Sequence, residues 1–209
     1  MEEETKRLKT GTTTVGVVCD GAVVLGAERK ATMGYLMASK AARKILQLDD
    51  HIGMTIAGSV GDAQALERYI KAELKLYKLN EEKRINVKAA ASLIANILYS
   101  RRMFPYIVQL IVGGHDGEPR LFSFDPSGSL MEEKEYFSSG SGSLTAFGVL
   151  EDSFKKGMKV EDAKRMVARA IYAATQRDIA SGGSGIDLVV VNSRGFREVP
   201  EDEIKKFIK

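Results

Sequence analysis

The sequence is poor in cysteine and histidine, the residues on which disulfide-bonded and zinc-binding proteins depend. Its 209 residues include one cysteine, two histidines, four prolines and no tryptophan. A single cysteine, Cys19, excludes a disulfide within the chain and fits a reducing compartment, for which we expect the cytoplasm. The two histidines, His51 and His115, lack the spacing of metal ligands, so we expect no zinc site.

Long apolar runs and an excess of one charge are also missing. No stretch is long and apolar enough to predict a membrane span, and residues 1–11 have no apolar core typical of a signal peptide. The 31 basic and 28 acidic residues nearly balance, and no basic run is interleaved with aromatic residues, so nucleic-acid binding is not predicted. With 44% hydrophobic residues, the chain is expected to fold as one globular domain.

The first quarter of the chain has the pattern of β-strands. Its strand-like runs are 13–18, 22–27, 33–38, 42–46 and 53–58. The first two are separated by Asp20-Gly21, a strong signal for a two-residue hairpin.

Helical periodicity then alternates with further strands. The residues expected in helices are 66–77, 87–98 with Asn86 as N-cap, 143–156, 163–174 and the C-terminal end. Strands are expected at 106–114, 120–125, 134–140 and 186–191, and the first of these is apolar enough to be covered on both faces. The order of strands, two helices, strands, two helices and a strand predicts an α+β fold, with helices on the outer faces of two sheets.

The stretch KTGTTTVGVV, residues 9–18, places a glycine before three threonines. Threonine is a good strand former, so the run is compatible with an ordinary strand. Gly11 is harder to explain, because glycine weakens the start of a strand. If the Thr12 hydroxyl attacks the peptide bond after Gly11, the Gly11 carbonyl must fold back against the Thr12 side chain, which is easier without a Cβ. Cleavage would leave Thr12 with a free α-amine, an activator of a threonine nucleophile. Thr13 is expected to face the other side of the strand.

Five segments in order resemble the β-type subunits of proteasomes, close to the archaeal form. They are TGTTTVG, LGAERKATMG, RKILQLDDHIGMTIAGSVGDAQ, FSSGSGS and QRDIASGG. The resemblance implies the four-layer αββα sandwich of N-terminal nucleophile hydrolases, threonine-type endopeptidase activity, and no metal or organic cofactor. It also implies a pro-segment at 1–11, removed by self-cleavage between Gly11 and Thr12, and a single peptidase domain at 12–209.

The resemblance assigns roles to individual residues. The nucleophile is Thr12, its partner acid is Glu28 and the essential lysine is Lys44, with the backbone N–H of Gly58 receiving the oxyanion. Supporting residues are Ser141, Asp178 and Ser181. Lys44 can accept a proton only when neutral; burial and the Thr12 ammonium would lower its pKa, whereas Glu28 would raise it. The division of proton transfer between Lys44 and the Thr12 amine stays open.

Two positions depart from the family pattern. Many members carry Asp where this chain has Glu28, which adds one methylene to the reach of the carboxylate. The stretch SGGSGIDL after Ser181 is slightly longer than usual. Without the resemblance, Glu28 and Lys44 would be interpreted as a surface ion pair, and the serine–glycine stretches as turns.

The family pocket for the residue before the cut maps onto Ala31, Ala42, Leu46, Ile56, Val60 and Gln64. None of the six is charged, so we expect cleavage after larger apolar residues. Thr32 is expected to hydrogen-bond the substrate backbone, so that an extended peptide adds as a strand.

The expected partners are other β subunits in a seven-membered ring, α-type subunits, an ATPase or other activator, and unfolded polypeptide substrates. One alternative is an inactive scaffold subunit of the same ring; it should lack the Gly–Thr junction, the acid or the lysine, and all three are present. Another is the bacterial two-component relative, whose chain is typically shorter. A Ser-His-Asp hydrolase is disfavoured because the sequence has no G-x-S-x-G.

Overall fold

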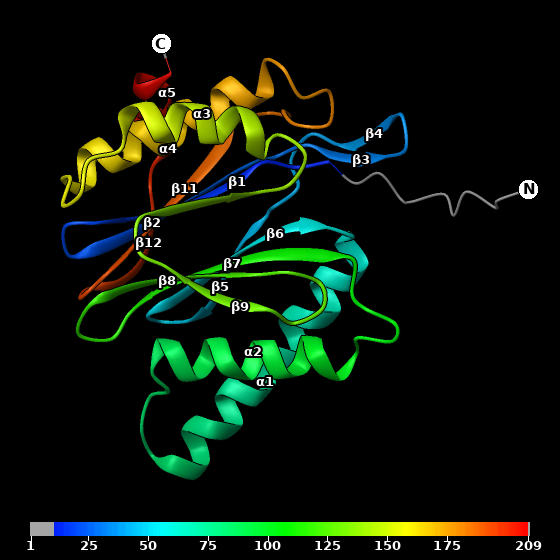
Figure 1. Cartoon of the computed structure of the whole chain (residues 1–209), viewed down its shortest axis with the longest axis vertical. Coiled ribbons are helices and arrows are strands. Elements are labelled where there is room, and N and C mark those ends of the chain that lie inside the picture. Colours follow the sequence, from blue (N-terminus) through cyan, green and yellow to red (C-terminus); the bar gives the residue numbers. More distant parts are fainter. Residues whose placement is uncertain (1–10, 209) are drawn as a thin grey trace, which may run out of the picture.

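Two five-stranded antiparallel sheets face each other between two layers of helices in the computed structural model, which describes residues 11–208 (Figure 1). The first sheet has the order β10-β1-β2-β11-β12 and the second β5-β6-β7-β8-β9. The strands of the first sheet are β1 (Thr14–Cys19), β2 (Ala22–Glu28), β10 (Tyr136–Ser139), β11 (Ile186–Asn192) and β12 (Gly195–Glu198). Those of the second are β5 (Ile45–Asp49), β6 (Ile52–Gly58), β7 (Val108–His115), β8 (Pro119–Phe124) and β9 (Leu130–Glu133).

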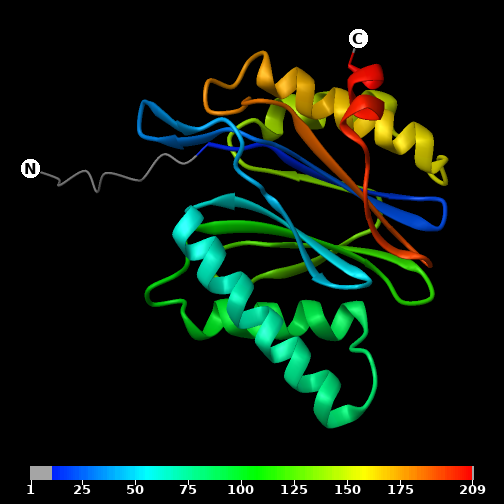
Figure 2. The same cartoon turned by 180° about the vertical axis from the view of Figure 1, so that it is seen from behind.

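Five helices and a small hairpin complete the fold. The helices are α1 (Val60–Glu81), α2 (Val87–Ser100), α3 (Ser143–Ser153), α4 (Val160–Thr175) and α5 (Glu201–Phe207). Helices α1 and α2 cover the second sheet, while α3, α4 and α5 cover the first, as Figure 2 shows from behind. The hairpin of β3 (Ala31–Met33) and β4 (Leu36–Ser39) projects from the end of the sandwich where the described chain begins (Figure 1).

The core is divided by the sheets into three apolar layers. One layer lies beneath α1 and α2, one beneath α3 and α4, and one between the sheets. Strand β2 borders two of them: Val24 points toward α4, and Val23 and Leu25 toward the other sheet, because successive side chains of a strand alternate in direction. All seven residues of β2 are therefore buried. Close packing also explains Gly26, where a Cβ would lie 2.4 Å from Cγ1 of Val167 in α4.

The α+β class, the αββα layers and the order of strands and helices are confirmed. The N-cap at Asn86 is confirmed as well, since its side-chain oxygen accepts from the N–H of Ala89 at 2.7 Å. Within residues 11–208, no helix combines the length and apolarity that crossing a membrane requires.

Two strand predictions were wrong in detail, and one strand was not predicted. The run 33–38 is interrupted by a turn at Gly34, which has φ of 60° and divides β3 from β4. The run at 42–46 is displaced, because β5 starts only at Ile45. Strand β9 was missed: half-exposed at the edge of its sheet, it ends in two glutamates and has no apolar run to mark it.

Candidate active site

Thr12 lies at the buried edge of the sandwich, two residues before β1. Its exposed fraction is 3%, and its hydroxyl donates to the Gly11 carbonyl at 2.5 Å, so the predicted contact between these groups is present. Only glycine fits at position 11 for a steric reason that the sequence does not reveal: a Cβ there would lie 1.7 Å from Cβ of Ala180. The Asp178–Gly182 segment therefore packs directly on the Gly11–Thr12 peptide. The rest of the predicted pro-segment, residues 1–10, lies outside the described residues.

Glu28, the last residue of β2, is completely buried and accepts hydrogen bonds from four donors. Its Oε1 accepts from the Lys44 ammonium and, at 3.3 Å, from the N–H of Thr13. Its Oε2 accepts from the backbone N–H groups of Lys30 at 2.6 Å and Gly182 at 3.0 Å. The pair of Glu28 and Lys44 is therefore not the surface ion pair that the isolated residues suggest. Both oxygens of the carboxylate are satisfied by fixed donors, which holds the charge in place.

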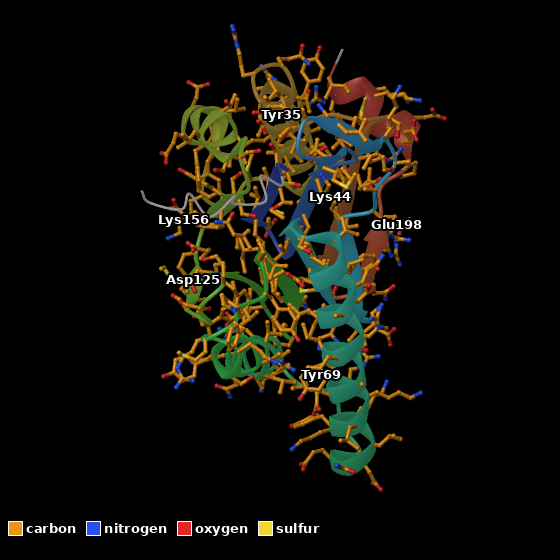
Figure 3. All side chains as sticks on the ribbon, turned by 90° about the vertical axis from the view of Figure 1, so that its right-hand side faces the viewer. Tyr35, Lys44, Tyr69, Asp125, Lys156 and Glu198 are labelled. Atoms are coloured by element: carbon orange, nitrogen blue, oxygen red, sulfur yellow. The ribbon has the colours of Figure 1, made fainter. Side chains whose placement is uncertain are left out.

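Lys44 precedes β5 and is 8% exposed. Its carbonyl accepts from the N–H of Ile56 in β6 at 3.0 Å, which fixes its backbone to the second sheet while its ammonium reaches Glu28 of the first. In the view of Figure 3, Lys44 lies below the β3–β4 hairpin, which carries Tyr35, and above the part of α1 that carries Tyr69. Burial lowers the pKa of Lys44 below its ordinary value, and the charge of Glu28 only partly opposes this. A lowered pKa makes the neutral, proton-accepting form easier to reach.

Ser141, Asp178 and Ser181 meet beside Thr12. Oδ2 of Asp178 accepts from the hydroxyl of Ser141 at 2.5 Å and from that of Ser181 at 2.6 Å. The Ser141 oxygen in turn accepts from the backbone N–H of Thr12 at 3.2 Å. The three residues predicted as supporting groups thus form one hydrogen-bonded cluster that contacts the nitrogen of Thr12.

Gly58 ends β6 in a conformation that favours glycine, with φ of 134°, and a Cβ there would lie 2.1 Å from the Ile107 carbonyl oxygen. Its neighbour Ala57 lies close to Gly140. If Gly140 had a Cβ, that atom would lie 3.4 Å from Cβ of Ala57 and 2.1 Å from the Thr12 carbonyl oxygen. The end of β6 therefore lies beside Thr12, across the narrow space that Gly140 leaves.

The residues predicted to line the substrate pocket come from four elements and differ in exposure. Ala31 and Thr32 are half-buried in β3, whereas Val60 and Gln64 are exposed one turn apart on α1. The Oγ1 atom of Thr32 is buried and has no hydrogen-bond partner within residues 11–208. The remaining three are Ala42 before β5, half-buried Leu46 in β5 and Ile56 in β6, of which Ile56 belongs to the core beneath α1 and α2.

Sequence reasoning missed several groups that complete the site. The main one is Thr13, which precedes β1 rather than belonging to it and whose hydroxyl lies 2.7 Å from that of Ser181. The backbone N–H groups of Lys30 and Gly182 at Glu28 were also missed. A backbone donor leaves no signal in a sequence, and the Thr13–Ser181 contact joins residues 168 positions apart.

Two facing antiparallel sheets between helical layers, with a buried threonine just before the first strand, define the fold of the N-terminal nucleophile hydrolases. Residues 8–191 match the family described as "Proteasome subunit". The chain is also similar to curated proteins named "Proteasome subunit beta". That of Methanothrix thermoacetophila is 48% identical over 95% of this chain and 96% of its own length.

Two further relatives carry the same name. That of Methanocorpusculum labreanum is 49% identical over 100% of this chain and 98% of its own, and that of Archaeoglobus fulgidus is 48% identical over 97% and 95%. This chain belongs to the proteasome subunit family.

Proposed function

We propose that this chain is the catalytic β subunit of a 20S proteasome core, a threonine-type endopeptidase that hydrolyses unfolded polypeptides. The observation that carries the proposal is the position of Thr12. The buried Glu28–Lys44 pair reaches the neighbouring N–H of Thr13, and the Ser141–Asp178 pair reaches the nitrogen of Thr12 itself. An inactive scaffold subunit would have no need of a buried ion pair beside this threonine, since burying charges costs free energy.

Activation is proposed to start from the contact between the Thr12 hydroxyl and the Gly11 carbonyl. The oxygen attacks the carbonyl carbon of Gly11, the C–N bond of the peptide breaks, and the Thr12 nitrogen takes up a proton to become an amine. Water then hydrolyses the resulting ester, which releases residues 1–11 with a carboxylate on Gly11 and restores the Thr12 hydroxyl. Two steps of lower barrier replace one difficult hydrolysis.

Substrate cleavage is proposed to use the same hydroxyl. As the Thr12 oxygen attacks the scissile carbonyl, its proton passes to neutral Lys44 or to the Thr12 amine, and the backbone N–H of Gly58 donates to the developing oxyanion. One such donor contributes roughly 10²–10³ in rate. The substrate amine leaves with a proton, and water hydrolyses the acyl ester to free the new carboxylate and Thr12.

The apolar side chains that line the proposed pocket favour cleavage after larger apolar residues. We infer further that the subunit assembles into a seven-membered β ring with α-type rings in the cytoplasm, and that an ATPase or other activator delivers substrates. The relatives support the β-subunit assignment through their names.

The intact mass of the assembled protein tests the proposal. A chain that has lost residues 1–11 and begins at Thr12 is expected, with hydrolysis of fluorogenic peptides. Thr12→Ala should retain the full chain and abolish hydrolysis, while Lys44→Ala should fail in both reactions. A full-length chain in an active particle, or hydrolysis by purified Thr12→Ala, would refute the assignment of Thr12.

A further inference from the structure

The hydroxyl of Thr13 belongs to a hydrogen-bond chain that ends at the nitrogen of Thr12. Its Oγ1 lies 2.7 Å from Oγ of Ser181, and both side chains are buried. Ser181 has a single hydroxyl proton, which it donates to Asp178 at 2.6 Å. The Ser181 oxygen can therefore only accept from Thr13, which makes Thr13 the donor at the end of the chain.

In the other half of the hydrogen-bond chain, each donor also points toward Asp178. Ser141 donates its only hydroxyl proton to the same Oδ2 of Asp178 at 2.5 Å, and its oxygen accepts from the Thr12 N–H at 3.2 Å. Asp178 thus accepts from two serine hydroxyls, one fed by Thr12 and the other by Thr13. Thr12 and Thr13, which are consecutive in the sequence, are therefore both connected to the Asp178 carboxylate, Thr12 through Ser141 and Thr13 through Ser181.

The backbone of Thr13 is fixed by the other acid of the site. Its N–H donates to Oε1 of Glu28 at 3.3 Å, and its carbonyl accepts from the Glu28 N–H at 3.4 Å. Thr13 is therefore bound through its main chain to the Glu28–Lys44 pair and through its side chain to the Ser181–Asp178 pair. It joins the two arms of the proposed machinery.

The backbone at Gly142 packs closely around the Thr13 hydroxyl. A Cβ on Gly142 would lie 2.1 Å from Oγ1 of Thr13 and 3.2 Å from Oγ of Ser181. The N–H of Gly142 also donates to the Thr12 carbonyl at 3.3 Å. The glycine at this point in GSG therefore lets the Thr13–Ser181 bond form against the backbone that holds Thr12.

We propose that Thr13 is a positioning residue: its hydroxyl orients Ser181 and Asp178, and through them the Ser141 oxygen that holds the Thr12 nitrogen. The proposal rests on the proposed function, because orientation of the Thr12 nitrogen affects catalysis only if Thr12 is the nucleophile. Thr13 makes no contact with substrate in this role. Its loss should lower kcat while leaving KM almost unchanged.

Thr14 supplies a matched control on the next residue. Its hydroxyl makes an equally buried bond to Ser139, at 2.8 Å, where β1 pairs with β10. That bond has the same chemistry and a similar length, but in the described structure it has no connection to Asp178. Thr13→Val and Thr14→Val therefore each remove one buried hydroxyl without changing side-chain shape, and only Thr13→Val interrupts the chain.

The experiment measures peptide hydrolysis by assembled, processed particles. We expect Thr13→Val to lower kcat about tenfold, the effect of losing one hydrogen bond, with KM within about twofold of the unmodified protein. Thr13→Ser keeps the hydroxyl and should restore kcat, while Thr14→Val should stay within about twofold. If Thr13→Val does not assemble, Thr13→Ala provides the same comparison without a bulky methyl group.

A double-mutant cycle gives the second readout. Because Thr13 acts through Ser181, Thr13→Val should cost nothing further in a Ser181→Ala background, whereas Thr14→Val should be additive there. Equal kcat values for Thr13→Val and Thr14→Val, or multiplying effects of Thr13→Val and Ser181→Ala, would overturn the proposal. Failure of the proposed function is distinguishable, because the unmodified particle would then be inactive or begin at a residue other than Thr12.

Discussion

At the scale of single residues, the proposed mechanism depends on the charge state of one buried lysine. Burial lowers the pKa of Lys44, so the neutral form becomes populated at a lower pH than for an exposed lysine, whose pKa is about 10.4. If neutral Lys44 accepts the proton of Thr12, kcat/KM should rise with pH through the Lys44 pKa and level off before pH 10.4. A pH–rate profile of the assembled peptidase measures this limb.

Lys44→Arg tests the origin of that limb. Arginine keeps the positive charge beside Glu28 but is not deprotonated in this range, so we expect the limb to vanish and the rate to fall about 10²-fold or more. Lys88→Arg, at an exposed position on α2, is the control and should leave the profile unchanged. An unaltered limb in Lys44→Arg would assign it to another group, such as the Thr12 amine.

The residues of the site differ in how far the sequence could predict them. No local sequence pattern identifies Glu28 and Lys44 as functional, and they were predicted only because they align together with Thr12 in the family resemblance. The structure shows that they contact each other. Thr13 was interpreted as strand because alternation separates it from Thr12. Alternation describes which way a side chain leaves a strand, and it carries no information about Ser181, which reaches Thr13 from a loop after α4.

At the scale of elements, the packing of α4 on β2 is tight enough to forbid a methyl group. A Cβ on Gly26 would lie 2.4 Å from Val167 and 2.6 Å from Ile171, both on α4. We expect Gly26→Ala to lower the free energy of unfolding by about 1–3 kcal/mol, because overpacking forces side chains out of their preferred rotamers. Urea unfolding at fixed protomer concentration measures the change.

Gly148→Ala is the matched control on the same side of the sandwich. Gly148 is exposed within α3, and apart from its chain neighbours and the backbone of its own helix no heavy atom lies within 4 Å of its Cβ position. Alanine there should raise the free energy of unfolding by up to about 1 kcal/mol, because it is the better helix former. Equal effects of the two substitutions would contradict the packing argument.

The helices and strands were predictable where burial imposes a periodic pattern of apolar residues. Helix α4 shows its buried stripe at every third or fourth residue, and β2 is apolar from Ala22 to Ala27, as far as Glu28, because both of its faces are covered. The errors fall where burial is weak. Strand β4 has no fully buried residue, and Tyr35 in the turn before it is completely exposed, so no core selects a pattern there.

At the scale of the whole molecule, the site exists only when distant parts of the chain meet. Gly11 and Thr12 contact the segments at 140–142 and 178–182, and Glu28 holds Lys44 between the two sheets. Helices α3 and α4 fix the two serine segments to the first sheet, while β5 and β6 carry Lys44 and Gly58 on the second. Any loosening of the two sheets should therefore reduce activity before the protein unfolds.

The single cysteine offers a probe of this global packing. Cys19 ends β1 at 5% exposure beneath α3 and α4, and burial, with a smaller contribution from Asp20, raises the pKa of its thiol to about 12. The native state therefore holds the thiol protonated, whereas the unfolded chain ionises with a pKa near 8.5. Since the unfolded state binds fewer protons between these values, stability contributed by the buried thiol is lost as pH rises from about 8.5 to 12.

A thiol reagent at pH 8 should therefore modify Cys19 only through unfolding. We expect negligible reaction with the native protein and complete reaction in urea, with a native-state rate that follows the equilibrium population of the open form. Gly26→Ala should accelerate the modification and Gly148→Ala should slow it, each by the factor by which its change in unfolding free energy alters the unfolding equilibrium constant. Rapid modification equal in both variants would show that Cys19 becomes accessible by local opening of the end of β1 that carries it, without separation of the layers.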